Sequence, residues 1–124
     1  MQEEIKLLIV DDSTIIRSTI EKHLSAFNIT IVGSAADGLE ALEIFKKARP
    51  AYVTLDITMP ELDGLKVLEE ILKVEPKTKV LVVTALSDKE TGIQAFELGA
   101  MGIVIKPFTP AKLQEEFDKL IRKS

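Results

Sequence analysis

The chain alternates between short, continuous apolar runs and longer segments in which apolar residues recur every three or four positions. Continuous runs rich in Val, Ile and Leu are typical of parallel strands that are covered on both faces, whereas half-exposed strands alternate between apolar and polar residues. The runs predict five strands, at residues 5–10, 29–32, 52–55, 79–83 and 102–105.

The segments that follow these runs have the spacing of amphipathic helices. Their apolar faces are formed by Ile16, Ile20, Leu24 and Phe27, by Leu39, Leu42 and Phe45, by Leu65, Leu68 and Leu72, and by Leu113, Phe117, Leu120 and Ile121. The segment 88–98 has a weaker stripe, of Ile93 and Phe96 only. Helix caps are predicted at Ser13, Asp37, Asp63 and Asp88, and Thr109-Pro110 places proline at the first position of a helix. Alternating strands and helices predict an α/β fold, with one parallel sheet that carries helices on both faces.

Length and composition favour a single domain spanning residues 1–124. A chain of 124 residues, 46% hydrophobic and 29% charged, can bury a core but has no room for a second domain. The net charge of −4 argues against binding to DNA or to an anionic membrane. The absence of cysteine excludes disulfides, and no apolar stretch reaches the roughly 18 residues of a membrane span. We therefore expect a soluble, cytoplasmic protein.

Polar side chains stand at the carboxyl ends of four of the five predicted strands. They are Asp11 and Asp12 after the first strand, Asp56 after the third, Thr84 after the fourth and Lys106 after the fifth. The second strand is followed by Gly33-Ser34, as expected for an edge strand that lies away from a site. We therefore expect a doubly wound, flavodoxin-like sheet of order 2-1-3-4-5, in which ligands bind at the carboxyl edge beside strands one and three.

This strand order brings three carboxylates together, those of Asp11, Asp12 and Asp56. Crowded carboxylates repel one another, and a shared cation relieves the repulsion. Mg²⁺ suits a small carboxylate cluster that stays open to water. A carboxylate beside Mg²⁺ can attack phosphorus, so Asp56 is a candidate nucleophile. Lys106 and Thr84 supply a positive charge and a hydroxyl donor, which suit the oxygens of a phosphoryl group.

Each of these residues also has an ordinary interpretation. Asp11 and Asp12 can end a strand and cap a helix, Asp56 can form a turn, and Thr84 and Lys106 are common at strand ends and surfaces. The combination favours phosphoryl chemistry, because complementary groups at four strand ends would be an unusual coincidence. No glycine-rich phosphate-binding motif follows the first strand, so nucleotide binding is not expected.

The same residues fall within motifs that identify a family. They are Leu-Ile-Val-Asp11-Asp12, Asp56-Ile-Thr-Met-Pro with Asp63-Gly64, Thr84-Ala85, and Lys106-Pro107-Phe108. In this order and spacing the chain resembles, over essentially its whole length, a response-regulator receiver domain of the CheY type. The resemblance implies that Asp56 accepts a phosphoryl group from the phosphohistidine of a sensor histidine kinase, and that Mg²⁺ is required.

The resemblance also implies how the site residues share this work. Asp12 and Asp56 would ligate Mg²⁺ directly, Thr58 through its main-chain carbonyl and Asp11 mainly through water. Lys106 would pair with the phosphoryl group. The peptide bond between Lys106 and Pro107 would be cis, which proline makes accessible at about 0.5–1 kcal/mol.

Two residues are implied as the switch. In the family, the residue at the position of Thr84 moves toward the phosphoryl group, and an aromatic residue three positions before the lysine turns inward. That second position is Ile103 here. The family's usual output surface is the fourth helix, fifth strand and fifth helix. Because no DNA-binding or catalytic region follows the fifth helix in this sequence, we expect output through a protein contact or onward phosphotransfer. A stand-alone chemotaxis-type regulator that is a monomer or weak dimer fits this best.

Three other interpretations stay open. A small Mg²⁺-dependent phosphohydrolase also forms an aspartyl phosphate, but the haloacid-dehalogenase class carries Asp-x-Asp after its first strand, where this chain has adjacent aspartates. A phosphorelay intermediate or an unphosphorylated interaction module would keep the same residues with a different output. For a receiver, the expected catalysis is limited to its own phosphorylation and dephosphorylation.

Overall fold

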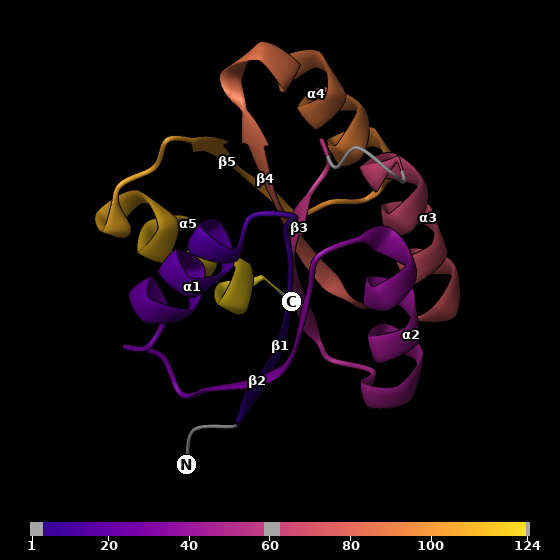
Figure 1. Ribbon diagram of the computed structural model, residues 1–124, viewed down its shortest axis with the longest axis horizontal. Coiled ribbons are helices and arrows are strands. Elements are labelled where there is room, and N and C mark those ends of the chain that lie inside the picture. Colours follow the sequence, from indigo (N-terminus) through magenta and orange to yellow (C-terminus); the bar gives the residue numbers. More distant parts are fainter. Residues whose placement is uncertain (1–3, 59–62, 124) are drawn as a thin grey trace.

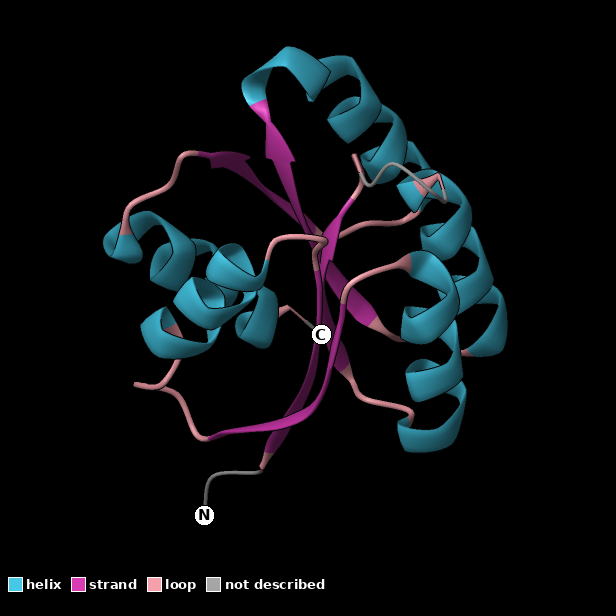
Figure 2. Cartoon of the chain, viewed as in Figure 1, coloured by secondary structure: helices cyan, strands magenta, loops and turns pink. Residues whose placement is uncertain are grey.

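The computed structural model describes residues 4–58 and 63–123, which form a repeated strand-and-helix chain (Figures 1 and 2). The strands are β1 (Ile5–Val10), β2 (Ile29–Ala35), β3 (Tyr52–Asp56), β4 (Lys79–Ala85) and β5 (Gly102–Lys106). The helices are α1 (Thr14–His23), α2 (Gly38–Ala48), α3 (Gly64–Val74), α4 (Lys89–Leu98) and α5 (Pro110–Arg122), with a single 3₁₀ turn, η1 (Leu86–Asp88), before α4. No helix within the described residues is long and apolar enough to cross a membrane.

The strands form one parallel sheet in the order β2-β1-β3-β4-β5, which confirms the predicted topology. Four strands continue further than the apolar runs indicated. β2 ends at Ala35, so Gly33 and Ser34 lie within the edge strand, and Asp56, Thr84 and Lys106 lie within the last residues of their strands. Polar residues continue the backbone ladder here because the neighbouring strand still offers partners. The three side chains therefore project from the sheet itself.

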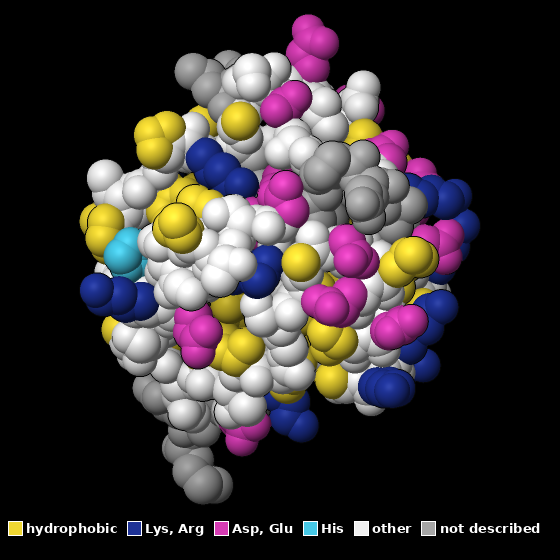
Figure 3. Space-filling model, in the orientation of Figure 1, with side chains coloured by type: hydrophobic (Ala, Val, Ile, Leu, Met, Phe, Trp, Pro, Cys, Tyr) yellow, Lys and Arg dark blue, Asp and Glu magenta, His cyan; other side chains and the backbone are white. Residues whose placement is uncertain are grey.

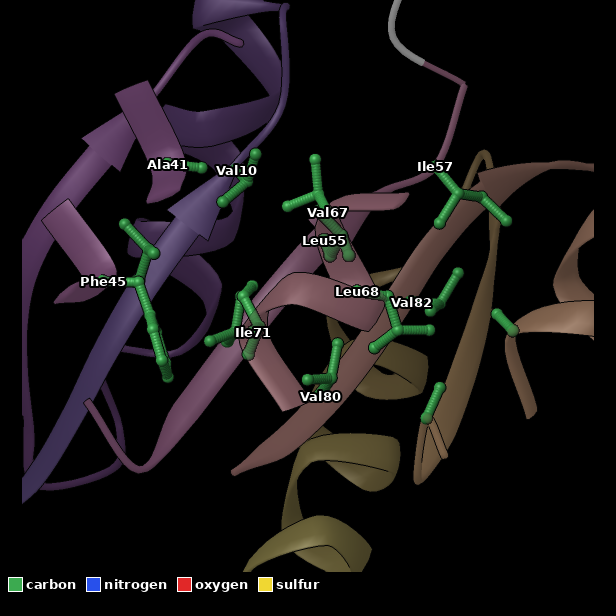
Figure 4. Close-up of a cluster of buried hydrophobic side chains, with 14 of the residues drawn as sticks. Val10, Ala41, Phe45, Leu55, Ile57, Val67, Leu68, Ile71, Val80 and Val82 are labelled. Atoms are coloured by element: carbon green, nitrogen blue, oxygen red, sulfur yellow. The ribbon is translucent and has the colours of Figure 1, made fainter. Parts of the chain in front are cut away.

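Helices cover both faces of the sheet, α1 and α5 on one side and α2, α3 and α4 on the other (Figure 1). The face under α2, α3 and α4 is filled by a buried cluster around Phe45, Leu55 and Leu68 (Figure 4). On the opposite face Phe117 of α5 packs among aliphatic residues from β1, β4 and α1. Each large side chain buried this way contributes about 1.5–3 kcal/mol, so the two clusters hold the strand ends in place.

The four predicted helix caps, Ser13, Asp37, Asp63 and Asp88, occupy the N-cap positions of their helices, and Thr109 does so before Pro110. The side chains of Ser13, Asp37, Asp63 and Thr109 each accept a hydrogen bond from a backbone N–H in the first turn of the helix that follows. Asp88 occupies the N-cap position of α4, but its side chain makes no such bond. It ends the η1 turn with φ −109° and ψ 27°, whereas Ser13, Asp37 and Thr109 have extended backbones that bring the side chain over the helix end.

A buried hydroxyl on β3 gives a stability prediction. Thr54 is fully buried between Ile9 and Leu81 of the adjacent strands, and within the described part of the chain its hydroxyl has no hydrogen-bond partner. We expect Thr54→Val to raise the free energy of unfolding by about 1 kcal/mol, because it removes an unsatisfied polar atom at nearly constant volume. Urea unfolding measures the change.

The matched control is Thr30→Val on β2, where the side chain is exposed and the same substitution should change the free energy by less than about 0.5 kcal/mol. A Thr54→Val protein less stable than the parent would show that the hydroxyl is satisfied after all.

Candidate functional site

Three carboxylates meet at the carboxyl edge of the two central strands. β1 and β3 are neighbours with Val10 opposite Leu55, so the side chains of the next residues, Asp11 and Asp56, lie side by side at this edge. Asp12 follows in the turn to α1. One oxygen from each of the three carboxylates lies within 4.8 Å of the others, and Asp11 and Asp56 are buried while Asp12 is exposed. The predicted convergence of the three aspartates is observed.

Lys106 reaches this cluster from β5, across the end of β4. Its Nζ donates a hydrogen bond to Asp11 Oδ2 at 2.8 Å and lies 3.5 Å from Asp56 Oδ2. The lysine side chain is 21% exposed, whereas those of Asp11 and Asp56 are 1% and 2% exposed. A single cation therefore compensates two nearly buried carboxylates, and a Coulomb interaction of this kind is much stronger than one between exposed groups.

The pKa values of Asp11 and Lys106 reflect this partial compensation of charge. Burial raises the pKa of Asp11 above its ordinary 3.8, and the charge of Asp56 raises it further, although hydrogen bonds from Lys106 and the Ser13 N–H oppose both effects. Burial also disfavours the charged lysine, but its contacts with Asp11 and Asp56 outweigh burial and raise the pKa of Lys106. At Asp11 the folded chain therefore binds a proton more tightly than the unfolded chain, so the contribution of this one group to the free energy of unfolding falls as the pH rises from 3.8 through its raised pKa.

Thr58 holds the carboxylate of Asp56 in one orientation. Its backbone N–H and its hydroxyl both donate to Asp56 Oδ1, at 3.0 and 2.7 Å. The other oxygen, Oδ2, is the one that lies near Lys106. The resemblance implied a main-chain role for Thr58, and the hydroxyl contact was not predicted. The N–H contact is that of an Asx turn, which aspartate commonly forms with the residue two positions later.

Arg17, which was not predicted as a site residue, holds the turn after β1. Arg17 of α1 donates from Nη1 to the main-chain carbonyl of Asp11 at 2.5 Å, and the Ser13 N–H donates to Asp11 Oδ1 at 2.9 Å. Spacing alone could not reveal this contact, because most arginines on a helix surface point into solvent. Together the two bonds fix the position of the buried aspartate.

Thr84 lies at the same edge, on the strand next to β3. Its side chain is fully buried, and its hydroxyl has no hydrogen-bond partner among the residues that the structure describes. Ile103, two strands from Asp56, is half-buried and packs on the face covered by α4 rather than in the carboxylate cluster. The peptide bond from Lys106 to Pro107 is cis. Met59 and Pro60 lie outside the described residues.

The donor set fits a small, hard cation. The oxygens of Asp11, Asp12 and Asp56 are close enough to share one ion, and exposed Asp12 leaves a side open to water. Mg²⁺ prefers oxygen ligands and keeps several waters, so this combination of two buried carboxylates and one exposed carboxylate suits it. Away from this cluster, acidic and basic side chains are mixed over α2 and α3, so the surface of these two helices is not uniformly acidic (Figure 3).

Comparison with known proteins places this site in a family. The response regulator receiver domain model matches residues 7–118. The chain belongs to this receiver domain family. It is 40% identical over 116 residues to protein CcdB of Bacillus subtilis, covering 94% of this chain and 97% of that protein. It is 35% identical over 115 residues to the chemotaxis protein CheY of Thermotoga maritima, covering 93% and 96%.

A solved receiver structure shows the same architecture. The receiver domain of AraT, a response regulator from Geobacillus stearothermophilus, superposes with a TM-score of 0.88 at 31% identity, covering 94% of this chain and 92% of that one. The five-stranded order and flanking helices are thus those of the family, and receiver domains act as phosphorylation switches in two-component systems.

Proposed function

We propose that the chain is a phosphorylation-dependent switch in which Asp56 accepts a phosphoryl group from the phosphohistidine of a sensor kinase. The supporting observation is the environment of Asp56: Thr58 holds one oxygen, and the other faces a lysine and shares a carboxylate cluster suited to Mg²⁺. In the transfer, Asp56 Oδ2 forms a bond to phosphorus as the phosphorus–nitrogen bond breaks. The imidazole leaves with the electron pair of that bond.

Each site residue has a defined part in this proposal. Asp12 and Asp56 would hold Mg²⁺ directly, Thr58 would hold it through its carbonyl, and Asp11 mainly through water. When bound, Mg²⁺ offsets the negative charge that gathers as carboxylate and phosphoryl oxygens approach one another. Lys106, already beside Asp56, pairs with the phosphoryl oxygens.

The change in protein contacts follows from the charge and oxygens of the phosphoryl group on Asp56. Phosphorylation replaces the −1 charge of the Asp56 carboxylate with a phosphoryl group that carries about −1.5 to −2 and three acceptor oxygens, which favours movement of Thr84 and its hydroxyl toward those oxygens. Ile103 responds to that movement, and the face formed by α4, β5 and α5 changes its protein contacts. Exposed Ile93 and Phe96 on α4 support this face as the output surface. Similarity to CheY proteins favours a chemotaxis pathway.

The remaining properties follow the same proposal. The receiver domain comprises all of residues 1–124 and acts in the cytoplasm as a monomer or weak dimer, without binding DNA or membrane. Its catalysis is confined to its own phosphorylation and dephosphorylation.

Incubation with acetyl phosphate, with and without Mg²⁺, tests the proposal. We expect intact mass spectrometry to show one phosphoryl group per chain, only when Mg²⁺ is present, because the metal offsets the charge of the acidic cluster. Peptide mapping should place the group at Asp56. Multiple turnover of general phosphomonoesters would instead support a phosphohydrolase. No incorporation from acetyl phosphate or from a histidine phosphodonor would support an interaction module that is not phosphorylated.

A further inference from the structure

The helix α4 has a gap in its buried face at Gly92. Gly92 is buried, and a Cβ built on it would overlap the terminal methyl group, Cδ1, of Ile103 on β5. The same Cβ position lies 3.7 Å from the methyl group of Thr84. The absence of a side chain at Gly92 therefore leaves a notch that Ile103 occupies, with Thr84 forming its wall.

Residues of three elements surround this notch. Thr84 is at the end of β4, Ile103 is on the neighbouring strand β5, and Gly92 is on the helix that covers both. Ile103 is half-buried, and its Cδ1 is the flexible end of an aliphatic side chain, whereas the Thr84 backbone is fixed in the sheet. Crowding in the notch is therefore relieved by movement of Ile103, not of the strands.

We propose that Gly92 is a positioning residue. Its missing side chain keeps a space for Ile103 and thereby sets how easily the Thr84 side chain moves away from α4 and toward the phosphoryl group. This inference rests on the proposed function, in which the Thr84 hydroxyl engages that group. Withdrawal of Thr84 opens room beside the notch, and the Ile103 terminal methyl group moves into it. The phosphorylation site and α4 are thus coupled through steric contact between aliphatic groups.

The test is a double-mutant cycle on Gly92 and Ile103, read out with Mg²⁺-beryllofluoride as the phosphoryl probe. Gly92→Ala crowds the notch, and the crowding is relieved once Thr84 withdraws, so the variant should bind the probe about threefold to tenfold more tightly than the parent. Ile103→Val removes the overlapping Cδ1. In the double variant the gain should therefore vanish. Isothermal titration calorimetry gives the four affinities.

The cycle also removes a competing explanation. Alanine favours helix over glycine, so Gly92→Ala can stabilise α4 by itself, but that effect is the same with Ile or Val at position 103. An equal gain in both backgrounds, or no gain in Gly92→Ala, would overturn the proposal. If the parent does not bind the probe at all, the proposed function fails as well, which distinguishes the two failures.

A second measurement needs no phosphoryl probe. In the free proteins, the Thr84 methyl resonance should shift in Gly92→Ala and return toward the parental value in the double variant. A Thr84 resonance that is insensitive to Gly92→Ala would show that the notch does not position Thr84.

Discussion

Asp56→Asn should abolish phosphorylation by acetyl phosphate in the presence of Mg²⁺. The substitution keeps the size of the side chain and an oxygen that can accept from Thr58, but an amide is not a nucleophile toward phosphorus and adds no charge for the metal. Intact mass spectrometry after incubation should show the unmodified mass only. Circular dichroism melting before the incubation establishes that the variant is folded.

The matched control is Asp37→Asn. Asp37 is an aspartate that caps α2, and asparagine caps helices about equally well, so this protein should take up one phosphoryl group as the parent does. An Asp56→Asn protein that gains an acid-labile phosphoryl group at the parental rate would contradict the assignment of Asp56.

The fold could be predicted from the sequence because the patterns that specify its strands and helices are local and repeated. Continuous apolar runs and three-to-four spacing predicted every strand and helix, and the polar residues at strand ends predicted the strand order. The strand ends were predicted too short, since Asp56 and Lys106 look like turn residues in sequence but still pair with a neighbouring strand. Asp88 is at the N-cap of α4 as predicted, but it makes no side-chain cap bond because it also ends the η1 turn, which hydrophobic periodicity does not reveal.

The site was predictable in its members but not in its connections. Topology alone requires Asp11 and Asp56 to meet, since they follow paired residues of adjacent strands. It does not specify that Lys106 contacts Asp11 more closely than Asp56, or that Thr58 uses its hydroxyl. These depend on side-chain rotamers and on burial. The role of Gly92 was likewise hidden, because a glycine within a helix is normally only a weak point.

Lys106→Met should lower the free energy of unfolding by about 3 kcal/mol in the presence of a chelator, because it leaves two nearly buried carboxylates without their cation. Methionine retains most of the apolar stem, so the loss reports mainly on the charge. Urea unfolding at neutral pH measures it. Lys112→Met is the control: Lys112 is exposed on α5 and pairs with Glu116 at 3.4 Å, a contact worth less than about 1 kcal/mol.

Adding Mg²⁺ turns the same variant into a test of the metal site. In the parent, Lys106 already compensates Asp11 and Asp56, so a bound cation must share those oxygens with it. Without the lysine the cluster is more negative, and Mg²⁺ should raise the stability of Lys106→Met by more than it raises that of the parent, through preferential binding to the folded state. Equal increments in the two proteins would indicate that Mg²⁺ binds away from these carboxylates. A loss in chelator no larger than that of Lys112→Met would show that Lys106 does not stabilise the fold through these carboxylates.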